Sequence, residues 1–194
     1  MNINLNNKEK IIKTTKIIVA IIILISVVFI YLWQQQKHEL NKNQKEEVYQ
    51  EYQQSLSLMN QGEFEQSVKM LEKIIKISPQ NINYLQTLAV VRYNLKDYNG
   101  AISICDKIIK QDPNNAFAYN SRGNAFRDFK KFVEAEESYY KAIEADPYFV
   151  VSYSNLALLL KEQNKKEEAR KIISIGLEKN PNSFELKTIE EIIK

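Results

Sequence analysis

Four prolines divide most of the chain into segments of equal length. Pro79, Pro113, Pro147 and Pro181 stand at equal intervals, and the chain has no other proline. Proline lacks an N–H donor and its ring clashes with the preceding helical turn, so it ends a helix. It can begin the next helix at little cost. Because each proline follows an amphipathic run, the sequence predicts helical units of one constant length that meet at the prolines.

Each unit contains two amphipathic stretches separated by a short turn. In the unit 116–149, apolar residues recur every three or four positions over 118–129 and again over 135–143. The breaks between the two stretches of each unit carry turn-forming residues and fall at 60–63, 96–97, 128–131 and 164–165. A period of two is absent from every unit, so we expect an all-α fold without a sheet.

The units resemble tetratricopeptide repeats (TPRs), which are helix–turn–helix units of the same length as the interval between the prolines. Small residues occupy the eighth and twentieth places of the units, and apolar or aromatic residues occupy the twenty-fourth. In the units 48–81, 82–115, 116–149 and 150–183, these places hold Ser55, Ala89, Gly123 and Ala157, then Ser67, Ala101, Ala135 and Ala169, then Leu71, Cys105, Tyr139 and Ile173. The small residues allow the two helices of a unit to approach closely.

A long apolar run precedes the repeats. Residues 17–33 contain no charged side chain, and as a helix they would span about 26 Å, close to the thickness of a bilayer's hydrocarbon core. Tyr31 and Trp33 stand at its end, where aromatic rings favour the membrane interface. A cleaved signal peptide fits less well, because its apolar region is usually about 7–15 residues long and ends at small side chains. The sequence therefore predicts an uncleaved transmembrane anchor.

The charges beside this run predict its orientation. Residues 1–16 are rich in lysine, whereas residues 34–47 mix lysine with glutamate, and positively charged flanks favour the cytoplasmic side. We expect a single-pass protein of a bacterial inner membrane with a cytoplasmic N-terminus and a periplasmic or extracytoplasmic repeat domain. The expected fold is a transmembrane helix followed by an α-solenoid. Its predicted parts are a basic tail (1–16), an anchor (17–33), a polar helical linker (34–47), four repeats (48–183) and a capping helix (184–194).

Motifs of enzymatic chemistry are absent from the sequence. It contains neither a glycine-rich phosphate loop nor a cluster of His, Cys and Asp at metal-ligand spacing. Cys105, the sole cysteine, falls at a core position of its repeat, and His38, the sole histidine, falls in the linker. The net charge of +3 arises in the N-terminal tail, which argues against nucleic-acid binding by the repeats. We expect no catalytic residue, no cofactor and no metal.

The resemblance implies a binding surface on the first helix of each unit. In the family these helices line a concave groove, and places two, five, nine, twelve and thirteen face it. The candidate peptide-binding residues at such places are Asn83, Gln86, Tyr93, Phe117, Asn120, Asn124, Arg127, Ser154 and Lys161. Their amides can hydrogen-bond an extended backbone, the aromatic rings can contact apolar side chains, and Arg127 can pair with a carboxylate.

One binding mode of the family is not expected. Some members hold the C-terminal carboxylate of a chaperone with a set of Lys, Asn and Arg residues. The corresponding places in this chain hold Tyr52, Leu56, Thr87, Phe117 and Ser121.

These observations favour a membrane-anchored scaffold or adaptor that binds a protein or peptide partner in its groove, in an envelope or secretion-related assembly. Confinement to a membrane would raise the effective concentration of a weak binder. One alternative is a structural module that self-associates as a homo-oligomer and has no peptide ligand. Another is a non-catalytic accessory subunit of a membrane-associated enzyme.

Overall fold

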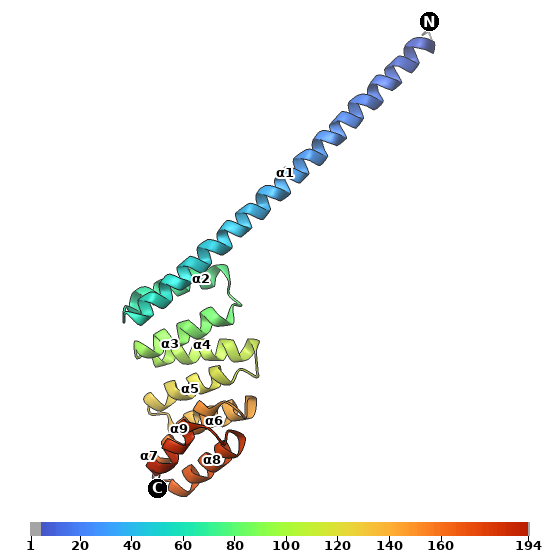
Figure 1. Ribbon diagram of the computed structural model, residues 1–194. Coiled ribbons are helices and arrows are strands. Elements are labelled where there is room, and N and C mark those ends of the chain that lie inside the picture. Colours follow the sequence, from blue (N-terminus) through green and yellow to red (C-terminus); the bar gives the residue numbers. More distant parts are fainter. Residues whose placement is uncertain (1–4, 194) are drawn as a thin grey trace. The chain divides into compact units, whose positions relative to one another are not determined.

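The computed structural model describes the backbone of residues 5–193 and the side chains of residues 24–193. Every regular element over that range is an α-helix, which confirms the all-α class. The helices are α1 (Leu5–Asn60), α2 (Phe64–Ile77), α3 (Ile82–Asn94), α4 (Tyr98–Gln111), α5 (Ala116–Asp128), α6 (Phe132–Ala145), α7 (Val150–Glu162), α8 (Lys166–Lys179) and α9 (Phe184–Ile193) (Figure 1). The chain divides into two compact units, residues 1–50 and residues 51–194.

The first unit contains most of α1 and bears on the predicted anchor. That prediction is wrong: within the described residues, none of the helices combines the length and the apolarity that crossing a membrane requires. The polar residues 34–47 continue the same helix beyond the apolar run. Part of the run, 17–23, and the tail, 1–16, have side chains outside the described residues.

The predicted localisation is wrong for the same reason as the predicted anchor. A single-pass inner-membrane protein was predicted from the apolarity and length of residues 17–33 and from the residues at their flanks, but the described helices do not supply a membrane-crossing segment. The predicted transmembrane element is therefore removed from the fold class, which retains the helical repeats.

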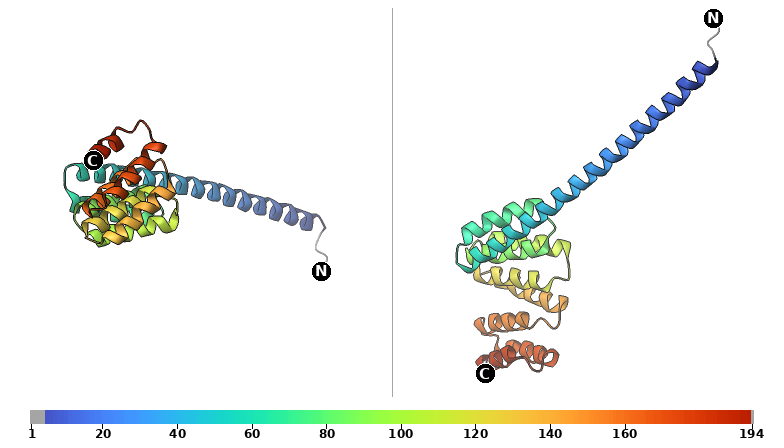
Figure 2. Two further views of the ribbon diagram at one scale, coloured as in Figure 1. Left: turned by 90° about the horizontal axis from the view of Figure 1, so that it is seen from below. Right: turned by 45° about the horizontal axis from the view of Figure 1, so that its top comes forward.

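The second unit consists of helices that pack in order along the chain. Each helix from α2 to α8 contacts the next, as two further views show (Figure 2). The first helices of successive repeats also contact one another, because α5 packs against both α3 and α7. The helices α3, α5 and α7 therefore form one continuous row.

The prolines lie between repeats, as the sequence predicts. The helices α2, α4, α6 and α8 each end two residues before a proline, and the next helix begins three residues after it. A backbone hydrogen bond closes each turn around the proline, for example from Asn81 N–H to Ser78 C=O at 3.2 Å. Proline suits the second position of such a turn because its ring holds φ in the range that this position requires.

A second recurring turn joins the two helices within each repeat. Its fifteenth place has a positive φ in all four repeats, at Gly62, Lys96, Lys130 and Asn164, with values of 61–81°. The N–H of the next residue bonds back to the end of the preceding helix, as Asp97 does to the Arg92 carbonyl at 2.9 Å. This left-handed position with its return bond is a common way to end a helix, and only the first repeat has glycine there.

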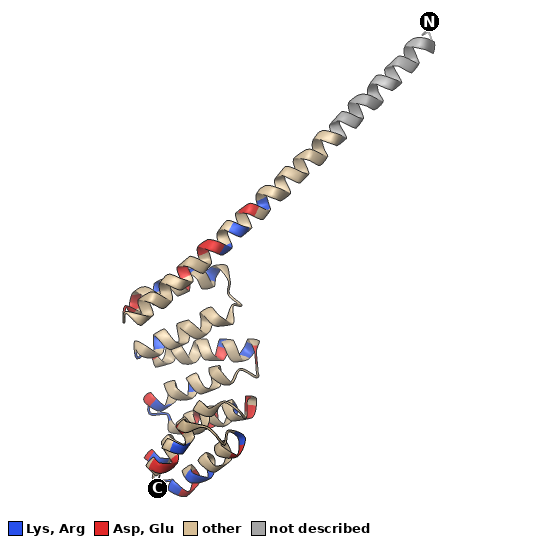
Figure 3. Cartoon of the chain, in the orientation of Figure 1, with Lys and Arg blue, Asp and Glu red and all other residues tan. Residues whose placement is uncertain are grey.

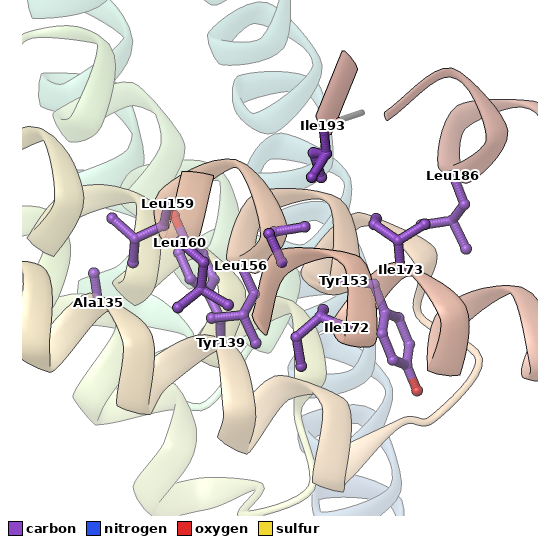
Figure 4. Close-up of a cluster of buried hydrophobic side chains, with 12 residues drawn as sticks. Ala135, Tyr139, Tyr153, Leu156, Leu159, Leu160, Ile172, Ile173, Leu186 and Ile193 are labelled. Atoms are coloured by element: carbon purple, nitrogen blue, oxygen red, sulfur yellow. The ribbon is translucent and has the colours of Figure 1, made fainter. Parts of the chain in front are cut away.

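A large apolar cluster extends from α6 through the last repeat to the C-terminal helix (Figure 4). Leu156, Leu160 and Ile173 are fully buried there, and Leu186 from α9 joins them. The helix α9 packs against both α7 and α8. Its apolar face therefore covers the end of the last repeat, where a further repeat would otherwise stack.

Candidate groove on the row of first helices

Two adjoining pockets of about 230 Å³ each lie along α3 and α5 in the second unit. The first, here called the Gln86 pocket, is lined by Tyr52, Met59, Asn83, Gln86, Thr87, Val90 and Phe117. The second, the Cys105 pocket, is lined by Ala89, Val90, Tyr93, Asn94, Ala101, Cys105, Phe117, Asn120, Ser121 and Asn124. Because Val90 and Phe117 line both pockets, we treat the two together as one groove.

The lining of the groove carries no formally charged side chain. Its polar groups are amides and hydroxyls, and three aromatic rings, those of Tyr52, Tyr93 and Phe117, also line it. Figure 3 shows the contrast along the second unit: α3 and α5 carry few charged residues, whereas α8 and α9 carry closely spaced ones. A ligand of this groove is therefore not held by an ion pair within either pocket.

Six of the nine residues predicted from the sequence line the groove. They are Asn83, Gln86, Tyr93, Phe117, Asn120 and Asn124. The other three lie outside its lining. Ser154 is buried and its hydroxyl donates to the Val150 carbonyl at 3.4 Å, Arg127 pairs with Asp128 at 2.9 Å, and Lys161 lies on α7 at the end of that helix.

Tyr93 forms part of a polar network beside the groove. Its hydroxyl donates to Asp128 at 2.5 Å, and Arg127 donates to the other oxygen of the same carboxylate at 2.9 Å. Burial, followed by the hydrogen bond and the charge of Asp128, raises the pKa of Tyr93 to about 12. Burial alone would raise the pKa of Asp128, but the hydrogen bonds from Tyr93 and Arg127 outweigh it and lower that pKa. The network links α3 to α5.

Asn124 is oriented by a tyrosine behind it. The hydroxyl of Tyr139 donates to Asn124 Oδ1 at 2.8 Å, and the ring of Tyr139 is fully buried. The ring lies against Gly123, where an added Cβ would stand only 2.5 Å from Tyr139 Cε1. Glycine at this place is therefore what allows the tyrosine to reach Asn124. Burial raises the pKa of Tyr139 far above the ordinary range, so the hydroxyl remains a donor.

The Asn120 side chain is oriented in a similar way, by two residues of the next repeat. Its Oδ1 accepts from Asn155 Nδ2 at 3.0 Å and from Ser152 Oγ at 3.4 Å. Since both asparagines use their oxygens within the protein, their Nδ2 groups remain as donors. Neither Nδ2 group has a hydrogen-bond partner among the residues that the structure describes, and both residues line the Cys105 pocket.

Three small residues, Ala89, Ala101 and Cys105, contribute to the lining of the Cys105 pocket. Cys105 is fully buried, as its core position in the sequence predicts. Burial, with a smaller contribution from Asp106, raises the pKa of its thiol to about 12, so the group is a neutral apolar surface at physiological pH. Their places in the repeat predicted a packing role for all three residues. A signal for the pocket was present in the twenty-fourth place, where Cys105 is the smallest of the four residues.

Over the residues with described side chains, no group of three or more His, Cys, Asp or Glu residues is placed to hold a metal ion.

Comparison with known families supports the repeats. Three sequence profiles, each described as "Tetratricopeptide repeat", match residues 58–121, 116–149 and 138–171. Residues 58–171 are tetratricopeptide repeats. No curated protein matches the chain.

Several solved structures share the TPR fold. A protein described as "MamA 41-end from Desulfovibrio magneticus RS-1" has a TM-score of 0.62 and 20% identity, over 69% of this chain and 76% of that one. The pilF protein of Pseudomonas aeruginosa has a TM-score of 0.63 and 22% identity, over 75% of this chain and 67% of that one. The first TPR of Spaghetti (RPAP3), bound to the HSP90 peptide SRMEEVD, has a TM-score of 0.53 and 27% identity, over 59% of this chain and 93% of that one.

Proposed function

We propose that the repeats form a protein-interaction module that holds an extended segment of a partner protein in the groove along α3 and α5. The observation that carries this proposal is the pair of adjoining pockets, which share Val90 and Phe117 and contain six of the nine residues predicted from the sequence. TPRs are protein-binding modules, and a peptide is bound to the TPR of Spaghetti.

The chemistry of the lining supports a peptide rather than a compact small molecule. Each pocket is smaller than the ~300–1,000 Å³ usual for sites that enclose a drug-sized ligand. Two shallow sites in a row instead suit successive side chains of an extended chain. Amides of the lining, such as Gln86 and Asn120, can bond to its backbone.

The envelope or secretion setting predicted from the sequence rested on the membrane anchor and loses its basis with it. Binding of a segment in the groove needs no anchor. An adaptor role and an accessory role beside an enzyme both require such binding, so the groove is the feature to test first.

The proposal can be tested by position-specific photo-crosslinking in the source cells. A benzoylphenylalanine in place of Phe117, which is 36% exposed in the groove, should give discrete crosslinked products. The matched control replaces Val133, which is 79% exposed on α6 and lines neither pocket. Products of the same pattern and yield from both positions would contradict the proposal. A product with the mass of two copies of this chain would instead favour the self-associating alternative.

A further inference from the structure

Building on the proposed function, we infer that the Cys105 pocket selects an uncharged segment, holding its backbone carbonyl oxygens on Asn120 and Asn124 and taking one small apolar side chain against Ala89, Ala101 and Cys105. The partner is thus defined as an extended peptide without charged residues at the positions that face the pocket. The inference names the chemistry of the ligand, which the proposed function leaves open.

The first support is the direction of the two amides in the structure. An asparagine amide normally presents either a donor or an acceptor, because it can turn over. In the structure, Tyr139 and Asn155 donate to the oxygens of Asn124 and Asn120 at 2.8 and 3.0 Å, so each of the two amides directs its Nδ2 group away from these partners. Both residues thus present N–H groups to the pocket, and N–H groups bind carbonyl oxygens.

The second support is the absence of charge. A charged side chain that entered the Cys105 pocket would lose its hydration without meeting an opposite charge in the lining, and such transfers are costly. The charged neighbours Arg127 and Asp128 neutralise each other in the network with Tyr93. The peptide seen with the TPR of Spaghetti, SRMEEVD, is acidic, so it is the type of ligand that this pocket should reject.

The third support is the size of the residue at the twenty-fourth place. The other repeats have Leu71, Tyr139 and Ile173 there, and all three are fully buried. Repeat two has the smaller Cys105, which is fully buried and stands among the residues that line the Cys105 pocket, a volume of about 230 Å³. A small apolar side chain of a ligand can occupy this volume, and removing its apolar surface from water would favour binding.

The test is selection of random heptapeptides, displayed on phage, by the full-length chain. We expect enriched sequences to be depleted of Asp, Glu, Lys and Arg relative to the starting library and to share a small apolar residue at one position. Synthetic copies should bind with an affinity that changes less than about twofold between low and high salt, because screening acts on charges. Enrichment of acidic sequences, or measurable binding of SRMEEVD in the groove, would overturn the inference.

Two variants separate the pocket from general folding. Cys105→Leu should weaken binding of the selected peptides at least tenfold, and leucine at this place is compatible with the fold because Leu71 occupies it in repeat one. The matched control Ile173→Leu, at the same place in repeat four, should leave binding unchanged.

Tyr139→Phe keeps the ring but releases the Asn124 amide. We expect it to weaken the binding of the selected peptides several-fold. The loss should be smaller for peptides in which an ester replaces the amide whose carbonyl group bonds to Asn124.

The outcomes distinguish this inference from the proposed function. Selected peptides that bind Cys105→Leu as well as the wild type, yet lose binding to Val90→Arg, would show that the groove binds peptides without using the Cys105 pocket as inferred. Failure of the wild type to enrich any sequence over Val90→Arg would overturn the inference and the proposed function together.

Discussion

Repeat two and repeat four share the same helix–turn–helix architecture but differ in how their inner volume is filled. In repeat two, Ala89, Ala101 and Cys105 leave volume that adjoins the groove. In repeat four, Ile173 occupies the place of Cys105 and packs in one cluster with Leu156 and the α9 residue Leu186. A repeat can therefore fill its inner volume with its own side chains or leave part of it for a ligand. The residue at the twenty-fourth place decides which of the two occurs.

The largest expected effect contrasts the two regions directly. Leu156→Ala should lower the free energy of unfolding by about 2–5 kcal/mol, because it leaves a cavity in a cluster that is closed on all sides. Cys105→Ala, its counterpart beside the groove, should cost about 1 kcal/mol or less, since the change removes a single sulfur atom rather than a branched side chain. Urea unfolding of the full chain, followed by circular dichroism, measures both. Equal losses would remove the distinction between the closed and the open region.

The next effect concerns repeat three, which lies between these regions. Gly123→Ala should destabilise by about 1–3 kcal/mol, because the new Cβ would overlap the buried ring of Tyr139. This cost exceeds the roughly 0.5–1 kcal/mol by which alanine is favoured over glycine within a helix. Adding Tyr139→Leu should recover most of the loss, since repeat one combines Ser55 with Leu71 at these places. A double variant no more stable than Gly123→Ala would contradict this account of the glycine.

A smaller effect comes from the turns that all repeats share. Lys96→Gly should raise the free energy of unfolding by up to about 1 kcal/mol, because Lys96 has a φ of 61° that glycine adopts without a steric cost. The reverse change in repeat one, Gly62→Ala, should lower it by a similar amount. The urea midpoints of the two variants should therefore move in opposite directions, and movement in the same direction would count against the turn assignment.

The smallest effect is a dependence on acid pH. The pKa of Asp128 is lowered in the folded protein from its usual value of 3.8, so this carboxylate contributes stability above that value and loses it as the pH falls through the folded pKa. Stability measured between pH 5 and about pH 2 should therefore fall less steeply in Asp128→Asn than in the wild type. Identical slopes would show that the network with Tyr93 and Arg127 contributes no linkage.

Much of the fold follows from the sequence, because the signals are local. Proline lacks a donor wherever it stands, and the position of Pro113 or Pro147 therefore predicts a helix end from the sequence alone. The small residues at the eighth and twentieth places likewise report helix crossings. The membrane anchor was predicted from the apolarity, the length and the flanking residues of 17–33, and none of the described helices is both long and apolar enough to cross a membrane.

The site was only partly predictable, because it depends on side chains that lie far apart in the sequence. The repeat position of Asn120 placed it in the groove, but only its contact with Asn155 shows which end of its amide remains for a ligand. Ser154 holds an equivalent kind of position and uses its hydroxyl within its own helix. The role of Tyr139 requires both Gly123 and Asn124 to be seen in space.

NMR of the side-chain amides shows whether the groove presents N–H donors to an uncharged segment. The full-length chain, labelled with ¹⁵N, is titrated with an uncharged heptapeptide obtained from the phage selection. The account predicts that the Nδ2 protons of Asn120 and Asn124 shift downfield, while those of Asn164, in the turn before α8, do not move. The absence of a shift at both groove asparagines would contradict the inference that their amides bind the segment.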